Sequence, residues 1–135
     1  MKIAINECYG GFGLSHDAIM RYAKLKGIKL FAFTEKDTND FKSRKFIEYK
    51  GQESFCIHYS TKPLKDGKYE EDSYFSTYDF KRDDPILIQV IEEMGEKANG
   101  MCSKLKIIDI PDGTEWQIEE YDGLEWIAEA HQTWN

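Results

Sequence analysis

The sequence predicts an α+β fold in a single domain that spans residues 1–135. Two segments, 16–26 and 85–98, repeat apolar residues at helical spacing. Two short apolar runs predict strands, one at 2–6, where Ile3 and Ile5 alternate with other residues, and one at 28–34. Near the C-terminal end, Asp122-Gly123 separates two strand-like runs, which is a strong hairpin signal. We therefore predict a mixed β-sheet with an N-terminal βαβ unit, two main helices, a central hairpin and a C-terminal hairpin.

The first helix is the best-marked element of the N-terminal part. Ser15 is a natural N-cap for a helix over 16–26, and Gly27 suits the left-handed position that ends it. With a strand on each side, at 2–6 and 28–34, the helix completes a βαβ unit. If these strands pair in parallel, the glycine-rich stretch before the helix lies at the carboxyl edge of the sheet, where ligands bind.

The middle of the chain gives weaker signals. Segments 46–49 and 54–60 resemble strands joined around residues 50–53, which predicts the central hairpin. Residues 62–72 are almost wholly polar and predict an exposed loop. Residues 73–80 are rich in aromatic and hydroxyl side chains, which is compatible with one more strand.

The second helix opens with Asp84 at the N-cap and Pro85 at the first helical position, and Asn99-Gly100 ends it. A strand over 104–110 and the C-terminal hairpin follow. The hairpin register sets Glu120 opposite Glu125, a repulsive pair. Three explanations stay open: another register, a helix over 124–134, or a cation beside the pair.

Charge is distributed unevenly along the chain. The net charge is −7, yet the last 29 residues carry eight carboxylates and no Lys or Arg. This excess argues against contact with a nucleic-acid backbone. It suits a basic partner, or it is simply a solvated face. No apolar run reaches the ~18 residues of a membrane span, and no signal-peptide core is visible, so we expect a cytoplasmic protein without a membrane partner.

The glycine-rich stretch at 8–13 is the strongest candidate binding site. Backbone amides and the positive end of a helix dipole converge there, which favours an anion or a phosphate. The stretch matches neither a Walker loop nor a dinucleotide fingerprint. The alternative is a tight turn whose glycines permit positive φ and close packing.

Aromatic and basic residues extend the candidate site. Tyr9 and Phe12 could stack on a base or a sugar. Arg82 could neutralise phosphate, although pairing with Asp83 or Asp84 is the simpler expectation. The predicted ligand-binding residues are Cys8, Tyr9, Gly10, Gly11, Phe12, Gly13, Ser15 and Arg82.

Catalysis has less support. Cys8 is a candidate nucleophile only if a base adjoins it, and the positions of His16, His58 and His131 cannot be derived from the sequence. The Glu120/Glu125 pair is a candidate acid and base. The scattered Cys and His residues lack metal-ligand spacing, and three cysteines, an odd number, suggest reduced thiols. We predict no catalytic residue, metal or cofactor.

The tryptophans add one expectation about packing. We expect Trp116 and Trp126 in the core. Trp134 would suit an oligomer interface, so a homo-oligomer stays open.

Several motifs carry a resemblance to a known family. They are residues 2–6 with Cys-Tyr-Gly-Gly-Phe-Gly-Leu-Ser at 8–15, Arg-Asp-Asp-Pro at 82–85 with the helix through 99–100, and Glu-Tyr-Asp-Gly-Leu-Glu-Trp-Ile-Ala-Glu at 120–129. In these, a little over half of its length, the chain resembles a family of small tailed-bacteriophage and prophage proteins without an established activity. The resemblance does not extend to residues 35–81. It implies a setting in the host cytoplasm, where phage proteins of this size are often anti-defence factors.

Three functional hypotheses follow. The leading one is a non-enzymatic protein that binds a phosphorylated, nucleotide-like small molecule at the glycine loop and sequesters a host immune signal. The second is an acidic inhibitor that binds a basic host protein through its C-terminal third. The third is an enzyme that modifies a nucleotide.

Overall fold

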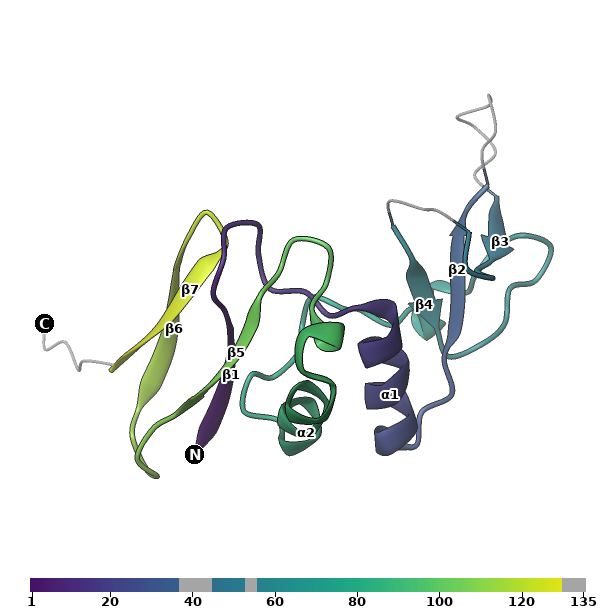
Figure 1. Ribbon diagram of the computed structural model, residues 1–135. Coiled ribbons are helices and arrows are strands. Elements are labelled where there is room, and N and C mark those ends of the chain that lie inside the picture. Colours follow the sequence, from purple (N-terminus) through teal and green to yellow (C-terminus); the bar gives the residue numbers. More distant parts are fainter. Residues whose placement is uncertain (37–44, 53–55, 130–135) are drawn as a thin grey trace, which may run out of the picture. The chain divides into compact units, whose positions relative to one another are not determined.

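The computed structural model describes residues 1–36, 45–52 and 56–129, and over these it confirms the α+β class (Figure 1). The helices are α1 (His16–Lys26) and α2 (Pro85–Met94), with short 3-10 turns at Glu71–Ser73 and Gly95–Ala98. The strands are β1 (Lys2–Asn6), β2 (Phe31–Glu35), β3 (Phe46–Glu48), β4 (His58–Ser60), β5 (Leu105–Asp109), β6 (Trp116–Tyr121) and β7 (Leu124–Glu129). None of the described helices is long and apolar enough to cross a membrane.

The chain divides into two compact units, which are described separately. Unit 1 consists of Met1–Tyr22 with Thr77–Asn135, and unit 2 is Ala23–Ser76. The prediction of a single domain stays a prediction.

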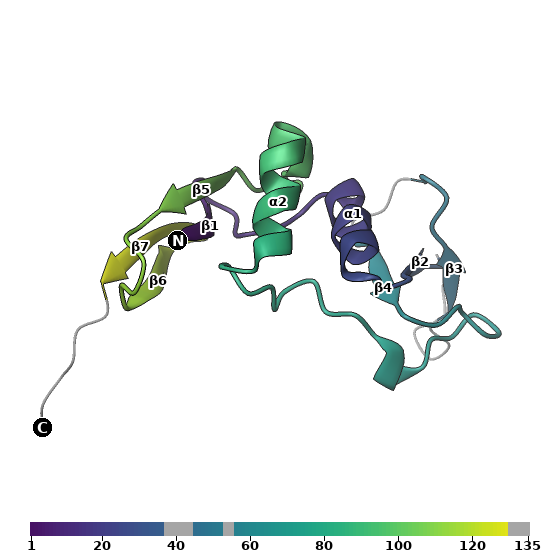
Figure 2. The same cartoon turned by 90° about the horizontal axis from the view of Figure 1, so that it is seen from below.

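Unit 1 is built around β1, whose residues Ile3, Ala4 and Ile5 are buried. β1 pairs antiparallel with β5, with Ala4 opposite Ile107. Its other neighbours are β7 and α2, and Figure 2 shows these elements side by side. The apolar run at the start of the chain is therefore a buried strand that pairs with β5 and packs against β7 and α2.

Both helices begin where their caps predict. The Ser15 hydroxyl accepts a hydrogen bond from the Ala18 amide at 3.2 Å. Asp84 accepts one from the Ile86 amide at 2.9 Å and another from the Tyr22 hydroxyl at 2.7 Å. The second helix is shorter than predicted, because it tightens into a 3-10 turn from Gly95.

The predicted strands are present in unit 2, but two of them pair differently. β2 lies between β3 and β4, antiparallel to both, so the predicted central hairpin between β3 and β4 does not form. Phe33 of β2 is fully buried and packs against Phe46, His58 and Tyr69. The longest apolar strand thus takes the central position, where it buries most surface.

Two further expectations differ from the structure. The strands flanking α1 belong to separate sheets, so the conditional parallel pairing does not occur, although the strand–helix–strand order does. Residues 73–80 form no strand: Ser73 ends a 3-10 turn, and Tyr74 makes an isolated bridge to Ser60. His131 and Trp134, whose positions were not predicted, and part of the strand predicted at 54–60 lie outside the described residues.

The C-terminal hairpin has the predicted register. β6 and β7 pair antiparallel around Asp122-Gly123, and Glu120 lies opposite Glu125. Residues 124–129 are a strand rather than part of the rival helix. Of the three explanations considered for the facing carboxylates, a nearby cation is the one observed.

Candidate functional site

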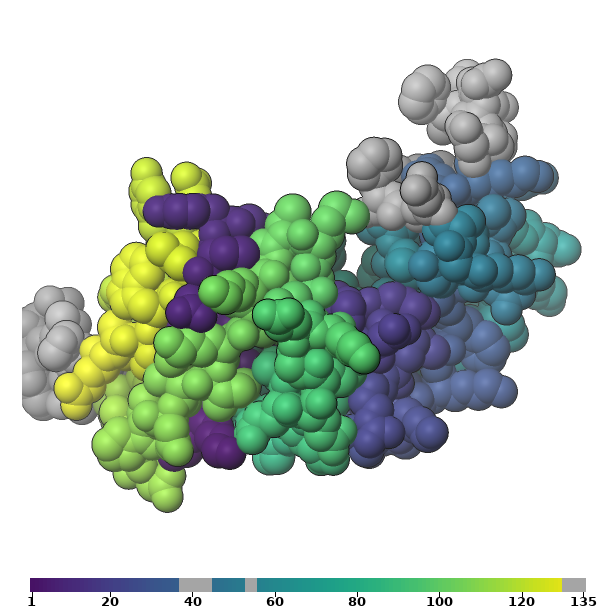
Figure 3. Space-filling view, viewed as in Figure 1, coloured from purple at the N-terminus to yellow at the C-terminus, as the bar shows by residue number. Residues whose placement is uncertain are grey.

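The glycine loop, residues 8–13, packs directly against two other loops of unit 1. The Gly10 amide donates to the Asp122 carbonyl in the β6–β7 turn at 3.0 Å. A Cβ on Gly123 would lie 2.2 Å from the Gly11 nitrogen, and one on Gly10 would lie 2.6 Å from the Cys102 carbonyl oxygen. Figure 3 shows the N-terminal segment, in purple, beside the C-terminal hairpin, in yellow. Close backbone contact therefore explains why positions 10 and 123 are occupied by glycine.

The second half of the loop is held in the same way. The Gly13 carbonyl accepts from the Gly100 amide at 3.0 Å and from the Ser103 hydroxyl at 2.6 Å. The Ser15 amide donates to the Ala98 carbonyl at 2.9 Å, and its hydroxyl donates to the Lys97 carbonyl at 2.7 Å. Ser15 is thus both a helix cap and a link to the segment after α2.

Asn6, at the end of β1, connects all three loops. Its fully buried side-chain amide donates to the carbonyls of Cys8 at 2.6 Å and Gly123 at 2.7 Å. Its side-chain oxygen accepts from the Lys104 amide at 2.9 Å. The side chain satisfies backbone groups that would otherwise be buried unpaired.

Arg82 reaches the glycine loop, but its charge is already paired. Its guanidinium makes two parallel bonds to Glu125, at 2.6 and 2.9 Å, and these side chains are only 19% and 8% exposed. The guanidinium carbon lies 3.7 Å from the centre of the Phe12 ring. The expected partners, Asp83 and Asp84, are not the ones used. The cation that relieves the Glu120/Glu125 repulsion is Arg82, and Glu120 turns instead to the Gly123 amide at 3.2 Å.

These contacts limit what an anion could use at the loop. The Gly10 and Ser15 amides have acceptors, and Arg82 is neutralised. Over the described part of the chain, the amides of Gly11, Phe12 and Gly13 have no acceptor. A Cβ on Gly11 or Gly13 would meet nothing within 4 Å, but the Gly11 nitrogen itself packs against Gly123. The loop retains a small cradle of amides without a free cation.

The candidate catalytic groups have structural partners. The Cys8 thiol contacts the Cys102 carbonyl oxygen at 3.2 Å and the Asn6 side-chain oxygen at 3.5 Å, and no described His or carboxylate bonds to it. Glu125 is paired with Arg82, and it accepts a hydrogen bond from the backbone amide of Asn6 at 2.8 Å. Within the described ranges, no group of three metal-ligating side chains is present.

The outward face of the β6–β7 hairpin carries exposed aromatic side chains. Trp126 lies opposite Glu119, and its indole donates to that carboxylate at 3.0 Å. By strand alternation Tyr121 and Leu124 share this face, whereas Glu125 turns towards β1. Tyr121 is 66% and Trp126 is 43% exposed. The expectation that Trp126 lies in the core is wrong, because the hairpin register places it opposite Glu119 on the outward side.

Two more exposed side chains lie on the glycine loop, which bonds to the β6–β7 turn, and on the loop before β5, which packs on the glycine loop. Tyr9 of the glycine loop is 65% exposed, and Met101, before Cys102, is 82% exposed. Both neighbour the Gly10 contacts with Asp122 and Cys102. We call the set Tyr9, Met101, Glu119, Tyr121, Leu124 and Trp126 the hairpin surface.

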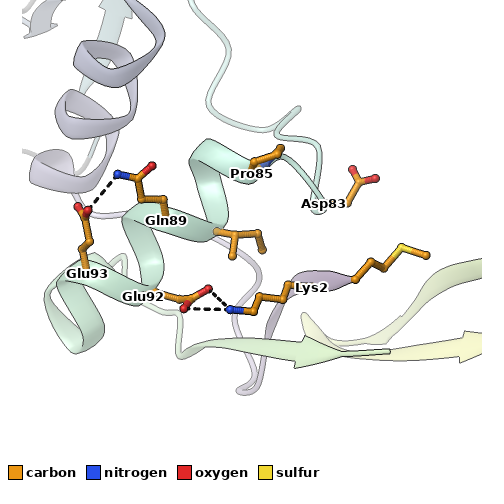
Figure 4. Close-up of a pocket in the computed structure, with 8 residues that line it drawn as sticks. Lys2, Asp83, Pro85, Gln89, Glu92 and Glu93 are labelled. Atoms are coloured by element: carbon orange, nitrogen blue, oxygen red, sulfur yellow. Dashed lines mark hydrogen bonds and ion pairs between the residues drawn. The ribbon is translucent and has the colours of Figure 1, made fainter. Parts of the chain in front are cut away.

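A pocket of about 590 Å³ lies elsewhere in unit 1, between β1 and α2 (Figure 4). Lys2 and Glu92 face each other there at 3.0 Å, and Gln89 bonds to Glu93 at 3.0 Å. Its polar side chains are exposed, and none of the predicted ligand-binding residues lines it. The pocket therefore offers no fixed, buried polar group for recognition.

No family model, curated protein or solved structure matches the chain. The resemblance to tailed-phage proteins stays a prediction, and function has to be inferred from the surface chemistry alone.

Sequence reasoning missed Asn6 and the pairing of Arg82 with Glu125. One signal was available for Asn6, which is a polar residue directly after the buried run Ile3-Ala4-Ile5. No local signal connects residues 82 and 125, because the pair is brought together by tertiary packing.

Proposed function

We propose that this is a non-enzymatic binding protein whose hairpin surface takes a protein partner with a basic surface. The observation that carries the proposal is the combination of exposed Tyr121 and Trp126 with carboxylates on one hairpin, and of exposed Tyr9 on the loop that bonds to its turn. Tyr, Trp and Met are enriched at protein interfaces and supply much of their binding energy.

Charge favours a basic partner. The hairpin and its turn carry Glu119, Glu120 and Asp122, all exposed, and no Lys or Arg occurs after Lys106. Complementary charge accelerates association and rejects acidic partners. The same field opposes a phosphorylated ligand or a nucleic acid.

A second candidate is the nucleotide-like small molecule predicted from the glycine loop. The specific observation in its favour is that the amides of Gly11, Phe12 and Gly13 have no acceptor in the described part of the chain. Tyr9 is exposed beside them and could stack on a base. The pairing of Arg82 with Glu125 weakens this candidate, because phosphate would have to displace a bidentate carboxylate.

The biological setting is part of the proposal. Following the phage resemblance, the protein acts in the cytoplasm of the host cell as an anti-defence factor. Under the first candidate it blocks a basic host protein, and under the second it sequesters a nucleotide signal.

Photo-crosslinking tests the first candidate. A benzophenone amino acid replaces Tyr121 in one variant and Tyr9 in another, and the proteins are expressed in bacteria. Tyr78, which is 84% exposed, provides the matched control position. We expect positions 9 and 121 to crosslink to a basic segment of one protein and position 78 to leave it unlabelled.

Two results would count against the protein partner. One is equal labelling from position 78. The other is the absence of any crosslinked protein together with calorimetric binding of a nucleotide that is lost in Gly11→Val, which would favour the second candidate.

A further inference from the structure

Two cysteines that are distant in the sequence lie in adjoining loops of unit 1. Cys8 opens the glycine loop and is partly buried, and Cys102 is exposed on the loop before β5. The Cys8 sulfur lies 3.2 Å from the Cys102 carbonyl oxygen. Cys102 is therefore placed where small reagents reach it, and Cys8 is directly beside its backbone.

The backbone around the two residues is already closely packed. A Cβ on Gly10, two residues after Cys8, would lie 2.7 Å from the Cys102 Cβ. Disulfides need Cα atoms about 4.4–6.8 Å apart and Cβ atoms about 4 Å apart. The Cys102 carbonyl oxygen is two bonds from the Cys102 Cα, so the Cys8 sulfur, 3.2 Å from that oxygen, lies within about 6 Å of that Cα. This separation is short enough for side-chain rotation to join the two sulfurs.

We propose that Cys8 and Cys102 form an oxidation site, at which a small-molecule disulfide such as oxidised glutathione generates an intramolecular bond. The Cys102 thiolate attacks that disulfide, forms a mixed disulfide and releases one thiol. The Cys8 thiol then loses its proton to solvent and attacks the Cys102 sulfur, which expels the second thiol. Two protein thiols are oxidised, and one glutathione disulfide is reduced to two thiols.

The bond would tie the glycine loop to the loop before β5. Tyr9 and Met101 each adjoin one of the cysteines, so oxidation would fix both side chains of the hairpin surface. This consequence for partner binding rests on the proposed function, whereas formation of the bond does not.

Oxidation of the full chain with glutathione disulfide tests the site. Cys56 is also exposed, lies in unit 2 and is the matched control. We expect the Cys56→Ser variant to lose two hydrogen atoms in mass, to yield one linked peptide containing Cys8 and Cys102, and to melt about 5 °C higher than its reduced form. Cys8→Ser and Cys102→Ser should instead keep glutathione on the remaining cysteine of the pair.

The proposal is overturned if the Cys56→Ser variant accumulates glutathione separately on both cysteines. It is equally overturned if the linked peptide joins two molecules. Since these readouts are masses and a melting temperature, they do not depend on whether a partner protein exists.

Discussion

At the scale of single residues, the site is dominated by the ion pair between Arg82 and Glu125. The Glu125 side chain is 8% exposed, and its carboxylate also accepts a hydrogen bond from the backbone amide of Asn6. A cation and an anion buried together need each other, because either one alone would remain poorly solvated. The pair is therefore a structural link between the segment before α2, β1 and β7.

Removing Glu125 should be costly. We expect Glu125→Ala to lower the free energy of unfolding by about 3 kcal/mol, because Arg82 loses its counter-charge in a partly buried position. The control is Glu92→Ala, which removes a carboxylate paired to Lys2 where the two side chains are 44% and 50% exposed. There we expect a loss below about 1 kcal/mol. Urea denaturation measures both, and equal losses would contradict this account.

Both truncating the Asn6 side chain and giving it a charge should destabilise the fold. Asn6→Ala leaves the carbonyls of Cys8 and Gly123 without their donor, which we expect to cost roughly 2–4 kcal/mol of unfolding free energy. Asn6→Asp keeps an acceptor for the Lys104 amide but turns a second oxygen towards those carbonyls. Thermal and urea unfolding should therefore show that Asp does not restore stability. A wild-type melting temperature in Asn6→Asp would show that the donor is dispensable.

At the scale of elements, the β6–β7 turn packs closely against the glycine loop. Gly123 has φ of +87° and faces the backbone of Gly10 and Gly11. Gly113 has a similar φ of +83°, yet a Cβ there would meet nothing within 4 Å. A substitution at Gly113 therefore tests the backbone strain alone, whereas one at Gly123 tests the strain together with the steric contact.

Substitution by alanine exploits that difference. Gly113→Ala should cost about 1 kcal/mol from the positive φ alone. Gly123→Ala should cost at least about 2 kcal/mol more, because the loops must move apart. Chemical denaturation of both variants measures the difference. A similar cost for the two would mean that the loop contact is loose.

The first turn of α1 contributes a pH dependence. Burial is the main cause that lowers the pKa of His16, and Asp17 opposes it more weakly. Since the fold favours the neutral ring, its contribution is complete above the ordinary pKa of 6.5 and is lost as the pH falls from there through the lowered pKa of the folded state. We expect His16→Gln to flatten the fall in unfolding free energy below about pH 6.5. An unchanged slope in urea unfolding would contradict this assignment.

How much the sequence could predict also differs between elements. α1, α2 and the C-terminal hairpin are specified by neighbouring residues, namely Ser15, Asp84-Pro85 and Asp122-Gly123, so local chemistry was sufficient. The pairing of β1 with β5, and the position of β2 between β3 and β4, depend on contacts between distant segments. The same limit applies to the site. The eight predicted residues include the whole glycine loop. The neutralisation of Arg82 by Glu125 could not be predicted, because only the tertiary fold brings these two residues together.

At the scale of the whole molecule, the two units differ in net charge. Unit 1 contains 16 carboxylates and seven Lys or Arg residues, whereas unit 2 contains nine and eleven. The acidic excess and the aromatic residues of the hairpin surface therefore belong to the same unit, although unit 2 also exposes Tyr74. This coincidence is the reason for preferring a basic protein partner over an anionic ligand.

The most direct test is the affinity for the crosslinked partner in matched variants. The double variant Glu119→Gln/Glu120→Gln removes two charges from the hairpin, and Gly13→Ala alters the glycine loop at a position without positive φ or a neighbour within 4 Å of the added Cβ. We expect the double variant to raise the dissociation constant about tenfold at low salt, with a smaller effect at high salt, and Gly13→Ala to leave it unchanged. The opposite pattern, with binding lost in Gly13→Ala and retained in the double variant, would contradict the proposed function.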